Sequence, residues 1–366
     1  MIPHPLHKPA VSLLPVCSCE LPAENLKRLP VERVDLLKGR GFPACDVRNR
    51  HCNSRRKCEF RMVKCSVKIE YSQLFHLSSS PERIRNILCA MRKTSMFVTD
   101  FDGTLTGDNS AFNERDIASL EELRQSGCTV VLASGRSPFS LRRTLGEQKL
   151  PVDWFVLSSG AGVMDSEGRV KVSHILSEKE TAEIHGAFTE LGISDISIQG
   201  PFPDAHLIHW IPADHGGDFT RRLEFYRGFY SGIDSPEISS SEVIGFVEPD
   251  KAEMVICFLK QKFKDRFSIV RTTSPLDGVT VWIEVFSRGV NKGSGCEFIR
   301  QKMGIKQNMT AAVGNDWNDI HMLDWAEKAY VTANAPKELL ERYTCVPCNN
   351  SGGVAEAASL WLEVLS

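Results

Sequence analysis

Apolar residues gather in short runs from residue 96 onward, and each run is followed by small or polar residues. The runs cover residues 96–99, 129–133, 154–157 and 310–314. They are short and do not alternate between apolar and polar positions. This pattern is typical of strands buried on both faces, as in a parallel sheet.

A helical pattern separates the first two runs. Asn113 can cap a helix that carries Ile117, Leu120 and Leu123 on one face and ends at Gly127. A strand, a helix and a second strand within roughly 40 residues are the signature of a right-handed βαβ unit. We therefore predict an α/β fold built on a parallel sheet.

The pattern changes between about residues 173 and 286. Segments 204–211, 253–260 and 277–286 resemble strands, and they alternate with helical stretches such as residues 219–230. We therefore predict that an α+β domain is inserted into the domain that holds the parallel sheet. The expected ranges are 93–172 and 288–366 for the two parts of the sheet domain, and 173–287 for the insertion.

Charge and cysteine content set the first 93 residues apart from the rest. They hold 18 Lys and Arg residues, 8 Asp and Glu residues and seven of the twelve cysteines. The cysteines lack the CxxC pairs of common zinc sites. This composition favours a basic, Cys-rich and poorly ordered extension over residues 1–92, with a zinc module or an organelle transit peptide as alternative interpretations.

The rest of the chain is acidic, with 26 basic and 38 acidic residues out of chain totals of 44 and 46. A domain of this charge is a poor general binder of nucleic acid. Any phosphate group that it binds must therefore be held locally, by a metal and a few cations. No apolar run approaches the roughly 20 residues of a membrane span, so we expect no membrane partner. We predict a cytoplasmic protein, with organelle targeting by the extension as the alternative.

Two carboxylates, Asp100 and Asp102, follow the first apolar run directly, and Gly103 lets the backbone turn sharply after them. The carboxyl end of a parallel strand is where such sheets bind ligands. Two carboxylates there repel each other, so a proton on one of them or a metal ion such as Mg²⁺ must offset the repulsion. A polar turn whose aspartates cap the next helix is the alternative.

Polar residues also follow the other runs. Ser134 and Gly135 follow the second run, and a hydroxyl beside an open amide can hold a phosphoryl oxygen. Lys292 lies at the start of a predicted helix. The turn after residue 314 crowds Asn315, Asp316, Asn318 and Asp319. A helix cap uses one side chain, so several acidic residues in one turn indicate a cation near Asp100.

Four stretches, in this order, resemble the motifs of the haloacid dehalogenase superfamily of phosphohydrolases. They read DFDGT at 100–104, ASGR at 133–136, GVNKG at 289–293 and GNDWND at 314–319. Their spacing, with TANAP at 332–336 and SGGVA at 351–355, resembles the Cof-like sugar-phosphatase branch. The resemblance implies a Rossmann-like, doubly wound core and identifies the insertion as a large α+β cap domain.

Two positions depart from the pattern of that branch. Its fourth motif usually reads Gly-Asp-x-x-Asn-Asp, whereas this chain has Asn315 at the first acidic place and Asp316 directly after it. An Asn ligates Mg²⁺ through its carbonyl oxygen but brings no charge. The sequence therefore leaves open whether Asn315, Asp316 or both contact the metal. Ser159 stands where the branch commonly has Asn, which would alter a hinge or substrate contact of the cap.

The resemblance implies a role for each matching residue. Asp100 would attack phosphorus and form an aspartyl-phosphate, while Asp102 would protonate the leaving oxygen and later accept a proton from water. Phosphoryl oxygens would be held by Ser134, Gly135 and Lys292. The catalytic set is then Asp100, Asp102, Ser134 and Lys292.

The same resemblance implies Mg²⁺ as the cofactor. It would be held by Asp100, Asp102 and the turn of the fourth motif, with Asn315, Asp316 and Asp319 as the candidates. Asp319 would orient either the metal's ligands or Lys292.

We therefore expect a Mg²⁺-dependent phosphomonoester hydrolase that acts on a small phosphorylated metabolite, with a sugar phosphate preferred over a pyridoxal or flavin phosphate. Cap residues would choose the leaving group, and the candidates by residue type are Phe202, Asp204, His206, His209, Trp210 and Trp282. The alternative functions are a phosphosugar mutase of the same superfamily, a non-catalytic phospho-ligand sensor, and a nucleic-acid interaction module in the basic extension.

Overall fold

The computed structural model describes residues 95–109, 111–212 and 215–366, which lie within one compact unit, Ser78–Ser366. The Cys-rich extension predicted over residues 1–92, with its zinc, targeting and nucleic-acid alternatives, lies outside the described residues. Within them the chain forms an eight-stranded sheet and a six-stranded sheet, which we call the core sheet and the cap sheet.

The core sheet has the strand order β14-β13-β12-β1-β2-β3-β4-β5. Six of its strands are parallel: β1 (Ser95–Asp100), β2 (Cys128–Ala133), β3 (Trp154–Leu157), β12 (Thr310–Gly314), β13 (Lys328–Thr332) and β14 (Thr344–Val346). The last two strands of this order, β4 (Gly162–Asp165) and β5 (Val170–Ser173), are each antiparallel to the strand before them. Every residue of β1 and β2 is buried, as expected for strands covered on both faces.

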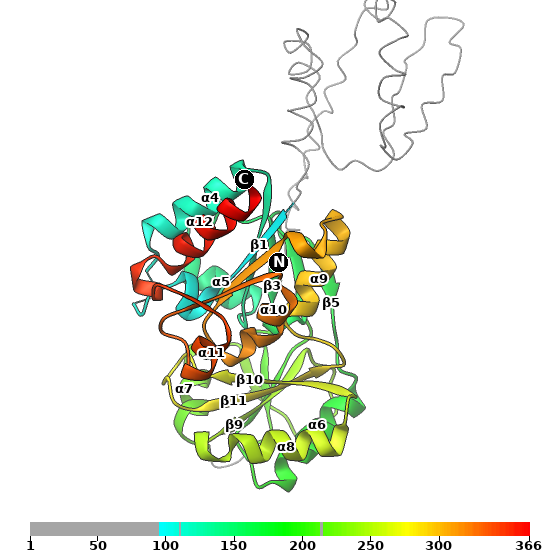
Figure 1. Ribbon diagram of the computed structural model, residues 1–366. Coiled ribbons are helices and arrows are strands. Elements are labelled where there is room, and N and C mark those ends of the chain that lie inside the picture. Colours follow the sequence, from blue (N-terminus) through cyan, green and yellow to red (C-terminus); the bar gives the residue numbers. More distant parts are fainter. Residues whose placement is uncertain (1–94, 110, 213–214) are drawn as a thin grey trace, which may run out of the picture. The chain divides into compact units, whose positions relative to one another are not determined.

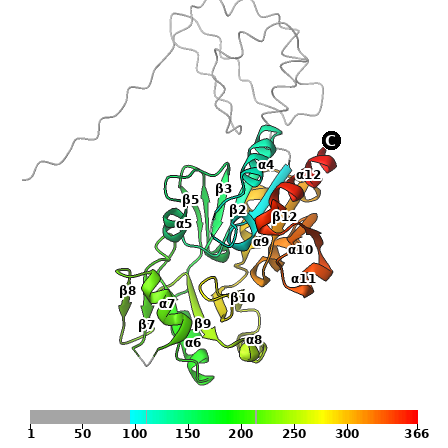
Figure 2. The ribbon, with the colours of Figure 1, turned by 90° about the vertical axis from the view of Figure 1, so that its left-hand side faces the viewer.

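Helices cover both faces of the core sheet (Figures 1 and 2). One face packs against α4 (Glu114–Gln125), α5 (Pro138–Leu145) and α12 (Gly353–Leu365), through residues such as Leu120, Leu141 and Trp361. The other face packs against α9 (Lys292–Met303), α10 (Ile320–Trp325) and α11 (Lys337–Arg342), through Cys296, Met322 and Leu339. The predicted doubly wound α/β fold is therefore confirmed.

The strand order places the ends of β1, β2 and β12 side by side. From β1 the chain adds β2 and β3 on one side, and it later returns to add β12, β13 and β14 on the other side. The order therefore reverses between β1 and β12. In open α/β sheets such a switch point is where a crevice opens beyond the carboxyl ends of the strands.

The predicted helix starts agree with the structure. Asn113 caps α4, where its side-chain oxygen accepts a hydrogen bond from the backbone N–H of Arg115 at 2.9 Å. Asn291 caps α9 in the same way, with the backbone N–H of Ser294 as donor at 2.9 Å. Lys292 is consequently the first residue of α9, and its position is fixed by the helix start.

The elements between Glu178 and Ser287, which we call the cap domain, form the cap sheet and its helices. The sheet has the order β10-β11-β9-β6-β7-β8 and is antiparallel except for the pair β7 and β8. Its strands are β6 (Ile196–Gln199), β7 (Ile208–Trp210), β8 (Tyr230–Gly232), β9 (Glu242–Val247), β10 (Phe267–Thr273) and β11 (Val281–Ser287). This domain lies within the range predicted for the insertion, residues 173–287.

Helices α6 (Glu178–Glu190) and α8 (Ala252–Phe263) cover one face of the cap sheet (Figure 1). The residues that meet them alternate along the strands, as Val243 and Val247 of β9 and Val281, Ile283 and Val285 of β11 do. The intervening residues point to the opposite face, where Ile244, Phe246 and Trp282 pack with Phe219 of α7 (Gly217–Phe225). That second face carries the part of the cap domain that meets the core.

Two secondary-structure predictions in the cap domain were wrong. Residues 253–260 were predicted to form a strand but belong to helix α8, because the buried residues Ala252, Val255, Ile256, Leu259 and Phe263 follow helical spacing. The predicted helix 219–230 ends earlier, at Phe225. Gly228 has a φ of +90°, and the chain then enters β8, which pairs with β7.

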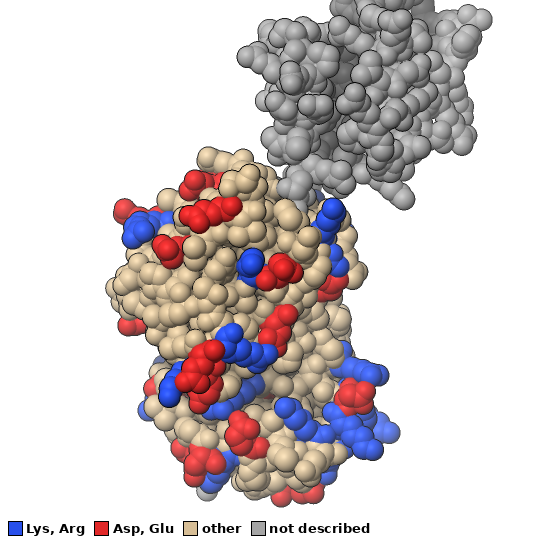
Figure 3. Space-filling view, viewed as in Figure 1, with Lys and Arg blue, Asp and Glu red and all other residues tan. Residues whose placement is uncertain are grey.

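The surface of the described residues carries charges of both signs. On the face in Figure 3, acidic and basic side chains are interspersed over the core and cap domains. Among residues 95–366 that the structure describes, no helix combines the length and the apolar character that crossing a membrane requires.

Candidate functional site

A cavity of about 660 Å³ lies between the ends of the core strands and the second face of the cap sheet. Its core side includes Asp100, Asp102 and Gly135, together with Lys292 and Asn315. The structure therefore brings together residues from all four sequence motifs. Ser134 lies directly beside the lining residue Gly135 and is itself fully buried.

Asp100 and Lys292 form a buried ion pair at the centre of this site. Lys292 Nζ donates to Asp100 Oδ1 at 2.6 Å and to Asp319 Oδ1 at 2.7 Å, and both side chains of the first pair are less than 5% exposed. Burial and the charge of Asp319 raise the pKa of Asp100, while Lys292 opposes that shift. Burial opposes the charge of Lys292, but Asp100 and Asp319 outweigh burial and raise the Lys292 pKa.

Asp319 uses both carboxylate oxygens to organise the site. Oδ1 accepts from Lys292, while Oδ2 accepts from the backbone N–H groups of Asn315 at 2.8 Å and Asp316 at 3.1 Å. The carboxylate reaches this position because Gly314 has no side chain: a Cβ there would lie 2.6 Å from Asp319 Cγ. Asp319 therefore fixes both the turn of the fourth motif and the position of Lys292.

Asn315 points its side-chain amide at an oxygen of Asp100, the last residue of β1, and at the backbone oxygen of Asp102. Its Oδ1 atom lies 3.2 Å from Asp100 Oδ2 and 2.9 Å from the backbone oxygen of Asp102, and it accepts a hydrogen bond from Thr104 at 2.9 Å. The Asn315 oxygen therefore faces two other acceptors. Either the amide turns its nitrogen toward those two oxygens, or a cation lies between the three oxygen atoms. Gly103, with a φ of +74°, permits this approach, because a Cβ there would lie 2.6 Å from Asn315 Nδ2.

Asp316 is turned toward the cap domain. Its two carboxylate oxygens accept hydrogen bonds from the backbone N–H of Thr273 at 2.8 Å and from the Thr273 hydroxyl at 3.0 Å. Thr273 is the last residue of β10. In this arrangement Asn315, and not Asp316, faces Asp100, and Asp316 joins the core to the cap.

Asp102 is held by Arg136, a residue whose role the sequence did not reveal. Arg136 Nε and Nη2 donate to the Asp102 carboxylate at 2.7 to 2.9 Å, and the guanidinium also lies over the Phe101 ring. Although burial opposes its charge, the hydrogen bonds of Asp102 raise the pKa of Arg136. The signal in the sequence was the Arg of the stretch SGRS, one residue after Gly135.

Ser134 and Gly135 form the turn after β2. The Ser134 hydroxyl oxygen accepts a hydrogen bond from the backbone N–H of Arg136 at 3.1 Å. That contact uses an oxygen lone pair and leaves the hydroxyl proton free to be donated to another acceptor. Ser159, in the turn after β3, donates to Glu284 Oε2 in the cap sheet at 2.8 Å, so the position that departs from the branch pattern contacts the cap.

The cap side of the cavity differs from what residue type alone indicated. Of the six candidates, Trp282 is among the lining residues, whereas Phe202, Asp204, His206, His209 and Trp210 are not. The cavity is lined instead by residues that the sequence did not single out: Arg222, Tyr226, Glu242, Ile244 and Glu284. The available signal was one Glu in each of two mostly apolar strands, EVIGFV and VWIEVFS.

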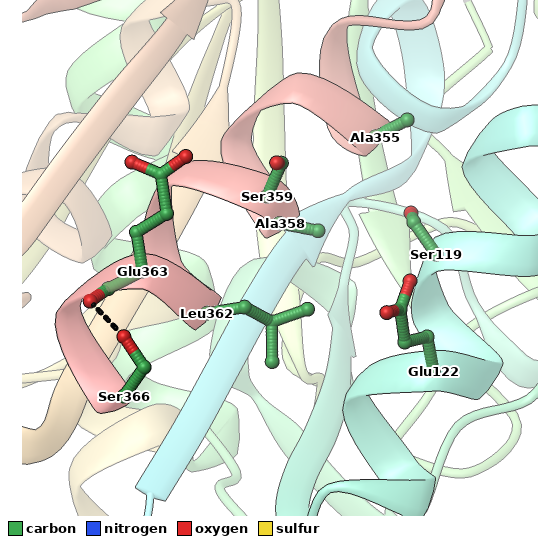
Figure 4. Close-up of a pocket in the computed structure, with 8 residues that line it drawn as sticks. All are labelled: Ser119, Glu122, Ala355, Ala358, Ser359, Leu362, Glu363 and Ser366. Atoms are coloured by element: carbon green, nitrogen blue, oxygen red, sulfur yellow. Dashed lines mark hydrogen bonds between the residues drawn. The ribbon is translucent and has the colours of Figure 1, made fainter.

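A second, smaller cavity of about 280 Å³ lies between α4 and α12 (Figure 4). It is lined by residues such as Ser119, Glu122 and Leu362, and it lacks a carboxylate paired with a lysine. Among the residues that the structure describes, no group of three His, Cys, Asp or Glu side chains is arranged to hold a metal. A metal at Asp100 would therefore use backbone and amide oxygens as well.

Two curated proteins align with most of the described residues. An HMP-PP phosphatase of Cronobacter sakazakii is 26% identical over 276 residues, which cover 72% of this chain and 94% of that protein. The phosphatase YwpJ of Bacillus subtilis is 23% identical over 277 residues, which cover 71% of this chain and 97% of that protein.

Solved structures share the fold at low sequence identity. The protein SMU.1108c of Streptococcus mutans has a TM-score of 0.62 and 18% identity, with 74% of this chain and 99% of that one covered. The subclass IIB sugar phosphatase BT4131 has a TM-score of 0.58 and 17% identity, with 73% of this chain and 99% of that one covered.

The family model of the haloacid dehalogenase-like hydrolases matches residues 97–357, which contain all four motifs and the residues gathered around Asp100. The chain therefore belongs to the haloacid dehalogenase-like hydrolases.

Proposed function

We propose that this chain is a Mg²⁺-dependent phosphatase that hydrolyses the monoester of a small phosphorylated metabolite, with sugar phosphates as its substrate class. One observation carries the proposal. The buried carboxylate of Asp100 has one oxygen bonded to Lys292 and the other 3.2 Å from the Asn315 amide, in a cavity that holds residues of all four motifs. The names of the curated relatives and the sugar phosphatase among the similar structures support it.

The donor set around Asp100 fits Mg²⁺. Oxygen ligands about 2.0–2.1 Å from Mg²⁺ and at right angles to each other stand about 3 Å apart. Asn315 Oδ1 lies at distances of this size from Asp100 Oδ2 (3.2 Å) and from the Asp102 backbone oxygen (2.9 Å). These three atoms would hold the metal, which when bound would neutralise charge on Asp100 and on the phosphoryl oxygens. Asp316 would not take part, because Thr273 occupies its carboxylate.

Hydrolysis would proceed in two displacements. Asp100 would attack phosphorus, and the bond to the leaving oxygen would break as that oxygen takes a proton from Asp102. Water would then attack the phosphorus of the aspartyl-phosphate and pass a proton to Asp102, which frees the Asp100 carboxylate and inorganic phosphate. The Arg136 guanidinium contacts both oxygens of Asp102 and so would hold this side chain in one position through both steps.

The remaining residues would stabilise charge and exclude water. Lys292 would offset negative charge on Asp100 and on the transferring group, while the Ser134 hydroxyl and the Gly135 amide would donate to equatorial oxygens. The cap domain would cover the site, as its contacts Asp316 to Thr273 and Ser159 to Glu284 indicate. Asp319 would act through Lys292 and the backbone of the fourth motif.

The proposal is tested by phosphate release from the full chain, with p-nitrophenyl phosphate and a panel of sugar phosphates, pyridoxal phosphate and flavin mononucleotide. We expect release that requires Mg²⁺ and stops with a chelator. In the Asp100→Asn variant turnover should fall by at least ~10⁴-fold, because an amide keeps the shape but not the nucleophile. A far-UV circular dichroism spectrum like the parent's and cooperative unfolding of that variant would show that the fold is intact.

Two outcomes would contradict the proposal. Substantial turnover by Asp100→Asn would remove Asp100 as the nucleophile. Binding of phosphate esters without release of phosphate would favour the sensor, whereas transfer of the phosphoryl group to a sugar, activated by a bisphosphorylated sugar, would favour the mutase.

A further inference from the structure

Two glutamates of the cap sheet face the cavity from neighbouring strands. Glu242 is the first residue of β9 and Glu284 lies in the middle of β11, on the side of the sheet away from α6 and α8. Both line the cavity that contains Asp100 and Lys292, yet they are only 5% and 4% exposed. Together with Arg222 of α7 they form a group that we call the roof.

The carboxylates of the roof have spare capacity as hydrogen-bond acceptors. Glu284 accepts from the Ser159 hydroxyl at 2.8 Å, whereas the Glu242 side chain has no hydrogen bond to any residue that the structure describes. Burial and the neighbouring Glu284 charge raise the pKa of Glu242. Burial also raises the pKa of Glu284, against hydrogen bonds from Ser159 and Thr272 and the charges of Arg222 and Lys292. Acceptors with lone pairs left over in a buried cavity are typical of a site that a ligand completes.

Arg222 supplies spare donors beside these acceptors. Its guanidinium packs 4.5 Å from the Trp282 ring centroid and 5.2 Å from that of Tyr226, and Nη2 donates to Gln199 at 3.3 Å. Trp282 is itself held by Asp218, which accepts from its Nε1 at 2.6 Å. The buried Nε of Arg222 has no partner in the described part of the chain. Arg222 is therefore fixed in place while part of its hydrogen-bonding capacity stays unused.

The donors and acceptors of the roof match some leaving groups better than others. A hydroxyl group both donates and accepts, so it can satisfy a carboxylate and a guanidinium at once. A carboxylate or a second phosphate on the leaving group would lie beside two carboxyl groups, with Arg222 as the one cation of the roof, and like charges placed together weaken binding. Ile244 and Trp282 add apolar surface for the carbon atoms between the hydroxyls.

We propose that Glu242, Glu284 and Arg222 bind the leaving group, and that this group is an uncharged polyol whose hydroxyls donate to both carboxylates and accept from Arg222. Leaving groups that carry a second anion are rejected at the same place. The inference rests on the proposed function, since it assigns a role in selecting the ester that Asp100 attacks.

The experiment uses pairs of phosphate esters that differ only in whether one end is an alcohol or a carboxylate. The pairs are glycerol 3-phosphate with 3-phosphoglycerate, erythritol 4-phosphate with 4-phosphoerythronate, and glucitol 6-phosphate with 6-phosphogluconate. For the full chain with Mg²⁺, we expect kcat/KM to favour the alcohol by at least 100-fold in the pair of best-fitting length.

Neutralising the roof should reduce this preference. In Glu242→Gln the ratio of the two kcat/KM values should fall at least tenfold, and in the double variant Glu242→Gln with Glu284→Gln it should approach one. Glu237→Gln is the matched control, because Glu237 is an exposed glutamate of the same domain. It should leave the ratio unchanged. Glu242→Gln alone carries the test if the double variant does not fold, since Glu242 holds no other residue by a hydrogen bond.

The outcomes separate this inference from the proposed function. Hydrolysis of p-nitrophenyl phosphate reports the phosphatase activity without a polyol. If that ester is hydrolysed but no pair shows a preference for the alcohol, or if Glu242→Gln leaves the preference intact, the roof does not select the leaving group. If no ester is hydrolysed at all, the proposed function itself fails.

Discussion

The charged groups on the two sides of the cavity differ in how completely their hydrogen bonds are satisfied. On the core side Lys292 is bonded to both Asp100 and Asp319, and Asp319 uses its second oxygen on two backbone amides. On the cap side the Glu242 carboxylate has no hydrogen bond to a described residue, and the Nε of Arg222 is unpartnered there. The groups proposed for chemistry are thus positioned before a ligand arrives, whereas those proposed for recognition are left incomplete for a ligand to satisfy.

This difference implies opposite costs when a charge is removed. Deleting one member of a satisfied buried pair leaves its partner uncompensated, which destabilises a protein strongly. Removing the charge of Glu242, which has no hydrogen-bonded partner among the described residues, relieves its repulsion with Glu284 instead. The predictions below measure that contrast, beginning with the largest effect.

The largest effect is expected for Lys292→Met, which leaves Asp100 and Asp319 buried without their cation. We expect the free energy of unfolding to fall by about 3–5 kcal/mol, and turnover to be lost. Chemical denaturation at pH 7 would measure the change. Lys302→Met, an exposed lysine on the same helix, should stay within about 0.5 kcal/mol of the parent. Equal stability of the two variants would show that the buried pair is not what holds the core side together.

Arg136→Lys should have the next largest effect. A lysine keeps the charge but cannot hold both oxygens of Asp102 as the guanidinium fork does. We expect kcat to fall by roughly 100-fold, as is common when a group that positions an acid or base is lost, while KM changes little. Steady-state kinetics with p-nitrophenyl phosphate would measure this.

Arg142→Lys, at an exposed residue of α5, is the control and should leave kcat unchanged. A normal kcat for Arg136→Lys would mean that Asp102 needs no fixed partner.

Variants of Asn315 and Asp316 can show which of the two residues is the metal ligand, because only a change at the ligand should alter how melting responds to Mg²⁺. Asn315→Asp adds a carboxylate beside Asp100 and should lower the Mg²⁺ concentration for half-maximal stabilisation about tenfold, because charge strengthens oxygen ligation of this ion. In metal-free buffer the same variant should melt earlier, since two carboxylates then face each other. Thermal melting across a Mg²⁺ titration would measure both effects.

Asp316→Asn is the matched variant in the adjacent position. It should weaken the contact with Thr273 in the cap domain but leave the Mg²⁺ response of melting unchanged. A shift in that response with Asp316→Asn, and none with Asn315→Asp, would move the metal ligand to Asp316.

Most of the core side of the site could be predicted from the sequence. Asp100, Ser134 and Asn315 each follow an apolar strand, and adjacent parallel strands end at one edge, so local patterns determine that these residues meet. Lys292 follows a helix cap that the sequence also shows. Which of Asn315 and Asp316 faces Asp100 could not be predicted, because Asp316 is bonded to Thr273, which is 43 residues earlier in the chain.

The cap side could not be predicted in the same way. Glu242 and Glu284 occupy strands whose other positions are mostly apolar, and their role depends on which face of the cap sheet meets the core. No local pattern determines that orientation. Helix α8 was mistaken for a strand for a related reason. A segment in which most residues are apolar fits the period of a helix and that of a strand, and only the elements that pack against it decide between them.

The smallest effect is expected for Glu242→Gln, and its sign is the sharpest test of the comparison. Burial and the charge of Glu284, against the charge of Arg222, raise the Glu242 pKa well above its ordinary value of 4.5. The folded protein therefore binds this proton more tightly than the unfolded chain. Stability from this group is fully present below pH 4.5 and is lost as pH rises toward the folded pKa.

Glutamine does not titrate, so Glu242→Gln should escape this loss. At pH 8 we expect the variant to be more stable than the parent by about 1 kcal/mol, and near pH 4 the difference should vanish. Denaturation curves at the two pH values, with Glu237→Gln as a control that shows no such trend, would measure it. A variant less stable than the parent at pH 8 would mean that the Glu242 carboxylate is already satisfied, and the contrast between the two sides of the cavity would disappear. A stabilised variant that also loses its preference for polyol esters would show that the parent keeps this carboxylate for recognition at the expense of stability.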